Sequence, residues 1–278
     1  MARHLNIRIS DGLDAALRAR AEQTDESVDH LVQAALAEAF GVEQHSMFQV
    51  STSGALVEGV YQGCVSVADL LRHGDFGLGT FDSLDGEMIV LDGVCFQARS
   101  DGSVDRASAD ALTPFAVVTT FTADRQARLS AAPSLSDFLA HLDGMRDSDN
   151  SFVGIRAHGT MVRIDLRAAC RTHPGVGLVE ATAHQAEHSF EQLRGTLVGF
   201  WTPPYAESIG VAGYHLHFIS EDRQHGGHVL GLQAQELDVE IHQVNDLHFA
   251  IPETAAFLKA RLGHGTAAAL EIVERARD

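Results

Sequence analysis

The chain has 278 residues, of which 45% are hydrophobic, so it can bury a substantial core in one large domain or two smaller ones. Its formal net charge of -18 disfavours general binding to nucleic-acid backbones or anionic membranes, because the summed field repels phosphate. No run approaches the roughly 18 apolar residues of a membrane span and no secretory signal is recognisable, so we expect a cytoplasmic protein. The cysteines are too few and too far apart for a disulfide framework, and we expect packed thiols at Cys64, Cys95 and Cys170.

The first part of the chain, residues 1–44, predicts a separate small domain of one strand and two helices. Apolar and polar residues alternate over residues 5–10, "LNIRIS", which is typical of a short half-buried strand. A serine that can act as N-cap precedes each of two helical stretches, residues 11–23 and 28–40. This order resembles a ribbon-helix-helix module, which buries its apolar faces only by pairing with a second copy. We therefore expect a homodimer or a higher homo-oligomer.

DNA binding by this module is possible but not favoured. In DNA-binding ribbon-helix-helix proteins the outward face of the paired ribbon enters the major groove, and here that face would present His4, Asn6 and Arg8. The module, however, has four arginines against eight acidic residues, a net charge of -4. Because phosphate neutralisation supplies most non-specific affinity, this charge argues against DNA. A metabolite-sensing DNA-binding regulator stays an alternative function.

The remainder, residues 45–278, predicts a second domain of the α+β class. From about Met47 onward, short apolar runs are separated by Gly, Asp and Pro, which indicates strands joined by turns. Helices are expected over residues 66–73 and 134–145, and residues 252–278 are helical in pattern. We expect a largely antiparallel, sheet- or barrel-like body with helices at its edges.

A cluster of histidines in "GYHLHFISEDRQHGGHVLG" is the main candidate for a metal site. His215 and His217 are two apart in an apolar strand, so both side chains leave the same face. With 16 histidines in the chain, such a pair alone is weak evidence and could lie on a solvated face. The stronger observation is His228, at the start of a strand that can return beside the first. Three imidazoles leave a fourth position open, as in a catalytic zinc site.

Other histidines and one carboxylate compete for this role. His225 lies in the polar loop and is the less favoured third ligand, and His242 and His248 are expected to be ordinary surface or hydrogen-bonded histidines. The spacing from His215 also approximates the HxH-x3-Glu pattern of cupin barrels, in which Glu221 would join the histidines on iron or manganese in an oxygenase. Glu221 begins a polar turn, where carboxylates are usually solvated.

Around these histidines the sequence resembles the alpha-acetolactate decarboxylase family over residues 47–278. The matching segments are "RGTLVGFWTPPYAESIGVAGYHLHFISEDRQHGGHVLG", "FQVSTSGALVEGVYQG", "GDFGLGTFDSLDGEMIVLDG" and "RTHPG". The resemblance implies a zinc enzyme that converts 2-acetolactate to acetoin and CO2 through a metal-stabilised enediolate. It implies the zinc ligands His215, His217 and His228. The N-terminal module is not part of the family pattern.

The same resemblance suggests catalytic roles for residues that would otherwise be read as ordinary. Glu87, by itself a solvated strand-end carboxylate, matches a catalytic acid-base group, and Arg171 in "RTHPG" matches an arginine that faces the substrate carboxylate. Thr80 is expected to place a hydroxyl in the pocket. Near the C-terminus the family's late catalytic glutamate matches Glu274 best, with Glu271 as the alternative. Which glutamate accepts a proton and which donates one stays open, as does the product enantiomer.

Overall fold

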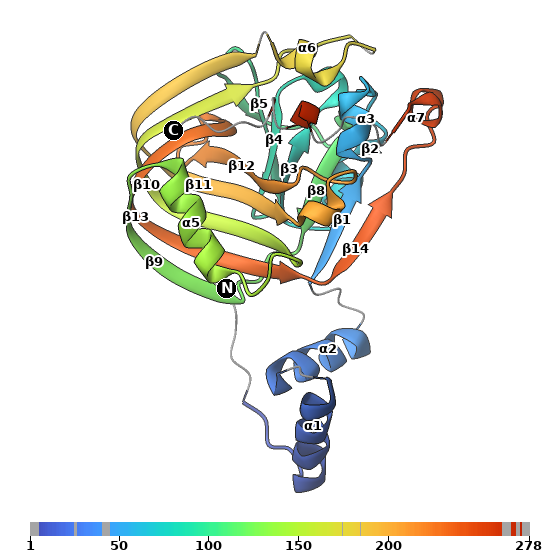
Figure 1. Ribbon diagram of the computed structural model, residues 1–278, viewed down its shortest axis with the longest axis vertical. Coiled ribbons are helices and arrows are strands. Elements are labelled where there is room, and N and C mark those ends of the chain that lie inside the picture. The colour runs from blue at the N-terminus through green and yellow to red at the C-terminus, as the bar shows by residue number, and fades with distance from the viewer. Residues whose placement is uncertain are drawn as a thin grey trace.

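The protein is described by a computed structural model (Figure 1). The structure describes residues 6–24, 27–40, 45–173, 175–183, 185–262, 268–270 and 273. No helix in this described part of the chain is both long and apolar enough to cross a membrane.

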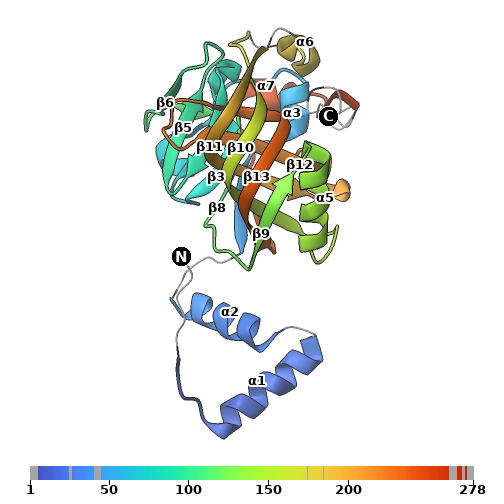
Figure 2. The same cartoon turned by 90° about the vertical axis from the view of Figure 1, so that its left-hand side faces the viewer.

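Two N-terminal helices, α1 (Asp11–Thr24) and α2 (Val28–Phe40), lie apart from the body of the protein (Figure 2). Both agree with the predicted stretches, and the backbone N–H of Leu13 donates to Ser10 Oγ over 3.3 Å at the start of α1. Residues 6–10 of the expected strand have no regular secondary structure, and Leu5 lies outside the described residues. A ribbon strand needs a second strand to pair with, and the described part of this single chain places none beside residues 6–10. The ribbon-helix-helix assignment therefore stays a prediction.

The body contains two main sheets. The first has seven strands in the order β14-β1-β8-β3-β4-β5-β6, antiparallel except for the parallel pair β1–β14. Its strands are β1 (Ser46–Val50), β3 (Phe76–Thr80), β4 (Glu87–Leu91), β5 (Val94–Ala98), β6 (Val104–Arg106), β8 (Phe115–Thr119) and β14 (Asp246–Ala250). β3, β4 and β8 are buried along their whole length, which explains why their sequences read as nearly continuous apolar runs. A separate two-stranded sheet pairs β2 (Val65–Ser66) with β7 (Leu112–Thr113).

The second main sheet is antiparallel and has long, curved strands (Figure 2). Its order is β10-β11-β12-β13-β9, and β10 also pairs with β13, so that β10, β11, β12 and β13 form a closed circuit. The strands are β9 (Arg125–Ala132), β10 (Phe152–Ala168), β11 (Ala186–Thr202), β12 (Gly213–Ser220) and β13 (Gly226–Val244). The predicted α+β class with mostly antiparallel strands is confirmed.

The helices are short and lie at the edges of the sheets. They are α3 (Ser53–Val57), α4 (Val67–Leu70), α5 (Leu135–Met145), α6 (Leu178–Thr182) and α7 (Ala255–Lys259), with 3-10 turns η1 (Asp82–Leu84) and η2 (Pro204–Ala206). α4 and α5 fall within the predicted stretches, and Ser66 and Ser134 cap them through their side-chain oxygens. The expected C-terminal helix is interrupted, because Ala260 has extended backbone angles after α7. Residues 268–270 and 273 are helical again.

The core has two main parts. One lies between the two sheets and includes residues from β3, β4, β8, β11 and the C-terminal segment, and the other lies between α5 and the inner face of the second sheet. In α5 the buried residues recur at helical spacing, which is why this segment forms an amphipathic helix: Leu135, Phe138, Leu142 and Met145. Cys95 is 2% exposed, and burial raises the pKa of its thiol to about 12.

Candidate active site and metal centre

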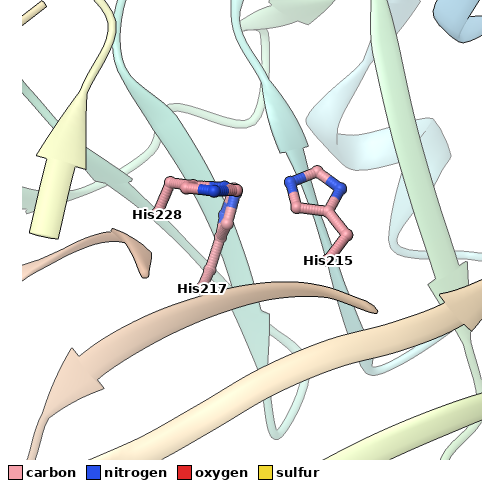
Figure 3. A group of neighbouring side chains, drawn as sticks. All are labelled: His215, His217 and His228. Atoms are coloured by element: carbon pink, nitrogen blue, oxygen red, sulfur yellow. The ribbon is translucent and has the colours of Figure 1, made fainter. Parts of the chain in front are cut away.

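Three histidines meet where the second sheet faces the first. His215 and His217 project from β12, and His228 stands opposite His217 in the register of β12 with β13. The ring centroids are 4.9 Å apart for His215 and His217, 5.0 Å for His215 and His228, and 5.5 Å for His217 and His228. One ligand atom from each lies within 4.8 Å of the others, and Figure 3 shows the three imidazoles gathered in one place. The structure thus brings together the three ligands expected from the sequence.

The protonation chemistry of this group fits a divalent metal ion. Desolvation, followed by the positive charge of Arg167, lowers the pKa of His215 to about 3, and the same two causes hold the pKa of His228 well below its usual range. His217 Nδ1 lies 2.8 Å from the carbonyl oxygen of Met88, which can only accept, so this nitrogen carries the proton. The lone pair of His217 is therefore on Nε2. Neutral imidazoles whose second nitrogen is fixed by a carbonyl are the usual ligands of zinc.

Glu87 stands beside this group at the start of β4. The residue is 7% exposed, its Oε2 lies 3.6 Å from His217 Nε2, and its Oε1 accepts from the backbone N–H of Ala169 over 3.2 Å. The preceding Gly86 has a φ of 89°, and a Cβ there would lie 2.3 Å from the carbonyl oxygen of Ala98. Glycine is required at this turn, and the turn aims Glu87 at the histidines.

The arginine at the histidines is Arg167 and not Arg171. Arg167 lies on β10, is 4% exposed and stands opposite His228 in the register of β10 with β13. Arg171 lies beyond the end of β10, is exposed and does not line the cavity beside the histidines. The sequence signal for Arg167 is its apolar surroundings, Leu166 and Ala168, but an arginine in an amphipathic strand is normally expected to face solvent.

A cavity of about 50 Å³ connects these groups. Its polar lining includes Thr80, Glu87, Arg167 and His215, and the other side is mostly apolar. Thr80 is 6% exposed and its Oγ1 donates to the carbonyl oxygen of Gly86 over 2.8 Å, so toward the cavity this hydroxyl can only accept.

The C-terminal segment reaches the same cavity. Leu270 and Val273 are part of its apolar lining and are 5% and 7% exposed. The two candidate late glutamates, Glu271 and Glu274, lie outside the described residues, so the structure gives neither of them a position.

The competing ligands lie elsewhere. The ring of His225 packs against Phe190, with centroids 4.4 Å apart, and His225 is not a member of the three-histidine group. Glu221, the candidate for a cupin-like site, lies in the turn after β12, where its carboxylate is 3.3 Å from Arg194 Nε and 62% of its side chain is exposed. The structure therefore does not assemble the cupin ligand set.

A second group of possible ligands, His45, Asp124 and His242, lies where the N-terminal module joins the body. The Nδ1 atoms of His45 and His242 lie 2.9 Å and 2.8 Å from the carbonyl oxygens of Gln243 and Thr122, and those N–H groups donate to them. Burial tends to raise the pKa of Asp124, but bonds from His242 and the Gln243 N–H, with the charges of the two histidines, lower it overall. This hydrogen bonding is typical of a structural cluster, and it places His242 among the hydrogen-bonded histidines expected from the sequence.

Comparison with known proteins agrees with this geometry. The family model for alpha-acetolactate decarboxylase matches residues 47–264. The alpha-acetolactate decarboxylase of Methanosarcina mazei is 41% identical over 230 residues, covering 82% of this chain and 80% of that protein. The enzyme of Bacillus subtilis is 39% identical over 217 residues, covering 78% of this chain and 85% of the relative. A crystal structure of the Bacillus subtilis protein superposes with a TM-score of 0.81 at 38% identity, covering 83% of this chain and 100% of that chain. The chain belongs to the alpha-acetolactate decarboxylase family.

Proposed function

We propose that this chain converts 2-acetolactate to acetoin and CO2. The observation that carries the proposal is one cavity lined by a buried arginine, a buried glutamate and a histidine of the three-histidine group, Arg167, Glu87 and His215. The substrate has a carboxylate for the arginine, an adjacent tertiary hydroxyl for a base, and a ketone oxygen for an electrophile. Arg167 therefore matches the substrate carboxylate by charge, Glu87 can act as the base toward the hydroxyl, and a metal ion held by the histidines can act as the electrophile toward the ketone oxygen.

The three histidines would hold a zinc ion. When bound, zinc would act as a Lewis acid toward the substrate's oxygens and lower the energy of the charge left by the departing CO2. His217 would keep its lone pair directed to the metal because the carbonyl oxygen of Met88 fixes its tautomer.

Arg167 would bind the substrate carboxylate in place of Arg171. Its planar guanidinium can form two parallel bonds to a carboxylate, and its burial protects these bonds from competing water. Arg167→Lys should raise KM for 2-acetolactate by about tenfold or more, whereas the exposed Arg171→Lys should leave KM and kcat unchanged. The reverse pattern in steady-state assays would assign the role to Arg171.

Glu87 and a C-terminal glutamate would handle the protons. As CO2 leaves, the electron pair of the broken C–C bond passes toward the ketone carbon and gives an enediolate. One carboxylate accepts the hydroxyl proton of the substrate and returns it to an oxygen of the product, and the other, in its protonated form, delivers a proton to one face of the enediolate. Glu87 is supported by its burial beside His217, and Glu274, with Glu271 as the alternative, by the position of Leu270 and Val273 on the cavity.

The direct test is to supply 2-acetolactate to zinc-loaded protein and to measure acetoin and CO2. Product above the spontaneous rate supports the proposal, and product at the spontaneous rate only would overturn it. Elemental analysis that finds iron, together with oxygen consumption, would favour the cupin-like oxygenase instead.

We also propose that residues 1–44 pair with a second copy of the chain. The support is a set of apolar side chains that this module leaves exposed, among them Ile7 at 57%, Leu13 at 50% and Phe40 at 76%. Deleting residues 1–44 should lower the solution mass or stability of the assembly and spare the zinc content. An unchanged mass and stability would refute the pairing, and a sequence-specific footprint at moderate salt would show that the module binds DNA.

A further inference from the structure

Gln185 contacts the arginine of the active site from outside the cavity. It lies between α6 and β11, and its Oε1 accepts a hydrogen bond from Arg167 NH1 over 3.0 Å. The other end of the amide, Nε2, donates to Glu187 Oε1 over 3.3 Å. The carboxylate of Glu187 can only accept from the amide nitrogen, so the amide oxygen is the end that faces Arg167.

The backbone of Gln185 is also fixed. Its N–H donates to the carbonyl oxygen of Thr182 over 3.1 Å, at the end of α6. Thr182 itself lines the cavity, and the pairing of β11 with β10 begins at the next residue, Ala186, opposite Ala168. The backbone of Gln185 is therefore anchored to α6, which lines the cavity, and to the start of the pairing between β10 and β11.

A neutral amide and a carboxylate would affect Arg167 differently. The guanidinium is planar and rigid, so a bond that fixes one of its nitrogens fixes the direction of the other N–H groups. An amide oxygen can do this without offsetting the positive charge of the guanidinium. A carboxylate in its place would form an ion pair with the arginine and compete with the substrate for that charge.

We propose that Gln185 is a positioning residue that orients the Arg167 guanidinium for the substrate carboxylate without neutralising it. This inference rests on the proposed function, in which Arg167 binds the carboxylate. Gln185 does not line the cavity, so its effect on the substrate passes through Arg167.

The test compares Gln185→Glu and Gln185→Leu with the wild-type full-length, zinc-loaded protein. Gln185→Glu should raise KM for 2-acetolactate by about tenfold or more and change kcat less, because it weakens carboxylate binding. Gln185→Leu should lower kcat/KM by a similar factor, because the guanidinium loses its fixed direction. Zinc content should match the wild type, and both variants should remain folded at the assay temperature. The control Gln126→Glu adds the same charge on β9, where Gln126 Nε2 donates to Glu240 over 3.1 Å, and should leave KM and kcat unchanged.

Affinity for 2-hydroxy-2-methylpropanoate provides a readout independent of turnover. This acid has the carboxylate and tertiary hydroxyl but no ketone to accept the electrons of decarboxylation. Calorimetry should show weaker binding to both Gln185 variants, and Gln185→Leu should add little further loss in an Arg167→Met background.

The outcomes separate the two proposals. A wild-type protein that forms no acetoin overturns the proposed function. A wild-type protein that forms acetoin, with Gln185→Glu and Gln185→Leu keeping wild-type KM and affinity, overturns the role of Gln185. Equal losses from Gln185→Leu with and without Arg167 would show a structural role that does not act through the arginine, and would overturn it too.

Discussion

The substitution Gly227→Ala tests whether the close contact of two strands sets the geometry of the active site. Gly227 precedes His228 on β13 and packs against β10 beside Arg167. A Cβ at position 227 would lie 2.5 Å from the carbonyl oxygen of Arg167 and 3.3 Å from the Cβ of Leu166. The two backbone segments that would have to separate therefore carry the proposed metal ligand His228 and the proposed substrate-binding Arg167.

The size of the effect follows from these distances. A carbon and an oxygen that are not bonded need about 3.2–3.5 Å, so the strands must separate by several tenths of an ångström to an ångström. Such overpacking typically costs about 1–3 kcal/mol, which in a protein of this size lowers Tm by roughly 2–4 °C per kcal/mol. Metal-ligand distances tolerate about 0.2 Å, so a displaced His228 should weaken zinc binding by about 10–100-fold.

The assay is zinc retention during titration with a chelator, together with thermal unfolding of the metal-free protein. Gly144→Ala is the matched control, because Gly144 lies in α5 and a Cβ there would meet nothing within 4 Å. Alanine favours a helix over glycine by about 1 kcal/mol, so the control should keep its zinc and equal or exceed the wild-type Tm. If Gly227→Ala also keeps wild-type zinc affinity and Tm, the contact between the strands does not fix the site.

Three further outcomes are expected. His215→Ala or His217→Ala should abolish zinc retention measured by elemental analysis, while His225→Ala should not; loss only in the last variant would overturn the ligand assignment. Glu87→Gln should keep the metal and fold but lower turnover by at least about 100-fold, and near-normal kcat would make Glu87 an ordinary carboxylate. Because the pKa of Asp124 is lowered in the fold, its stabilisation is present at neutral pH and is lost as pH falls below about 4. Asp124→Asn should therefore destabilise the metal-free protein at pH 7 and progressively less in acid, and an equal loss at both pH values in denaturant titrations would contradict this.

Local sequence patterns were sufficient to predict helix α5 and the grouping of the three histidines. Spacing by two in a strand places His215 and His217 on one face whatever the rest of the fold does, and a short hairpin is enough to bring His228 beside them. The same is true of α5, whose capping serine and apolar spacing lie within twelve neighbouring residues. The interacting residues are near one another in the chain, so their relative geometry can be predicted from the sequence.

Local sequence patterns could not identify Arg167 as a residue of the site, because its burial depends on tertiary structure. Arg163, Asp165 and Arg167 alternate on β10, and strict alternation would direct all three to the same solvated face. Ile164 and Leu166 both pack in the core beside α5, so Arg163, Asp165 and Arg167 do share the opposite face, but along that face burial rises from the exposed Arg163 to the buried Arg167. The cover over Arg167 comes from other parts of the chain, so its burial leaves no signature in the sequence of β10 itself.

The position of the charge, more than its total, explains how an acidic chain can bind an anionic substrate. The formal net charge is -18, yet among the described residues the cavity is lined by the buried guanidinium of Arg167, the neutral imidazole of His215 and the carboxylate of Glu87. Exposed charges are largely screened beyond about 8 Å at physiological ionic strength, whereas groups inside a buried cavity interact in a lower dielectric. The field at the substrate is therefore set mainly by the few groups that line the cavity. On this reasoning the neutrality of Gln185 matters as much as the charge of Arg167, because a carboxylate hydrogen-bonded to the guanidinium from outside the cavity would offset its positive charge.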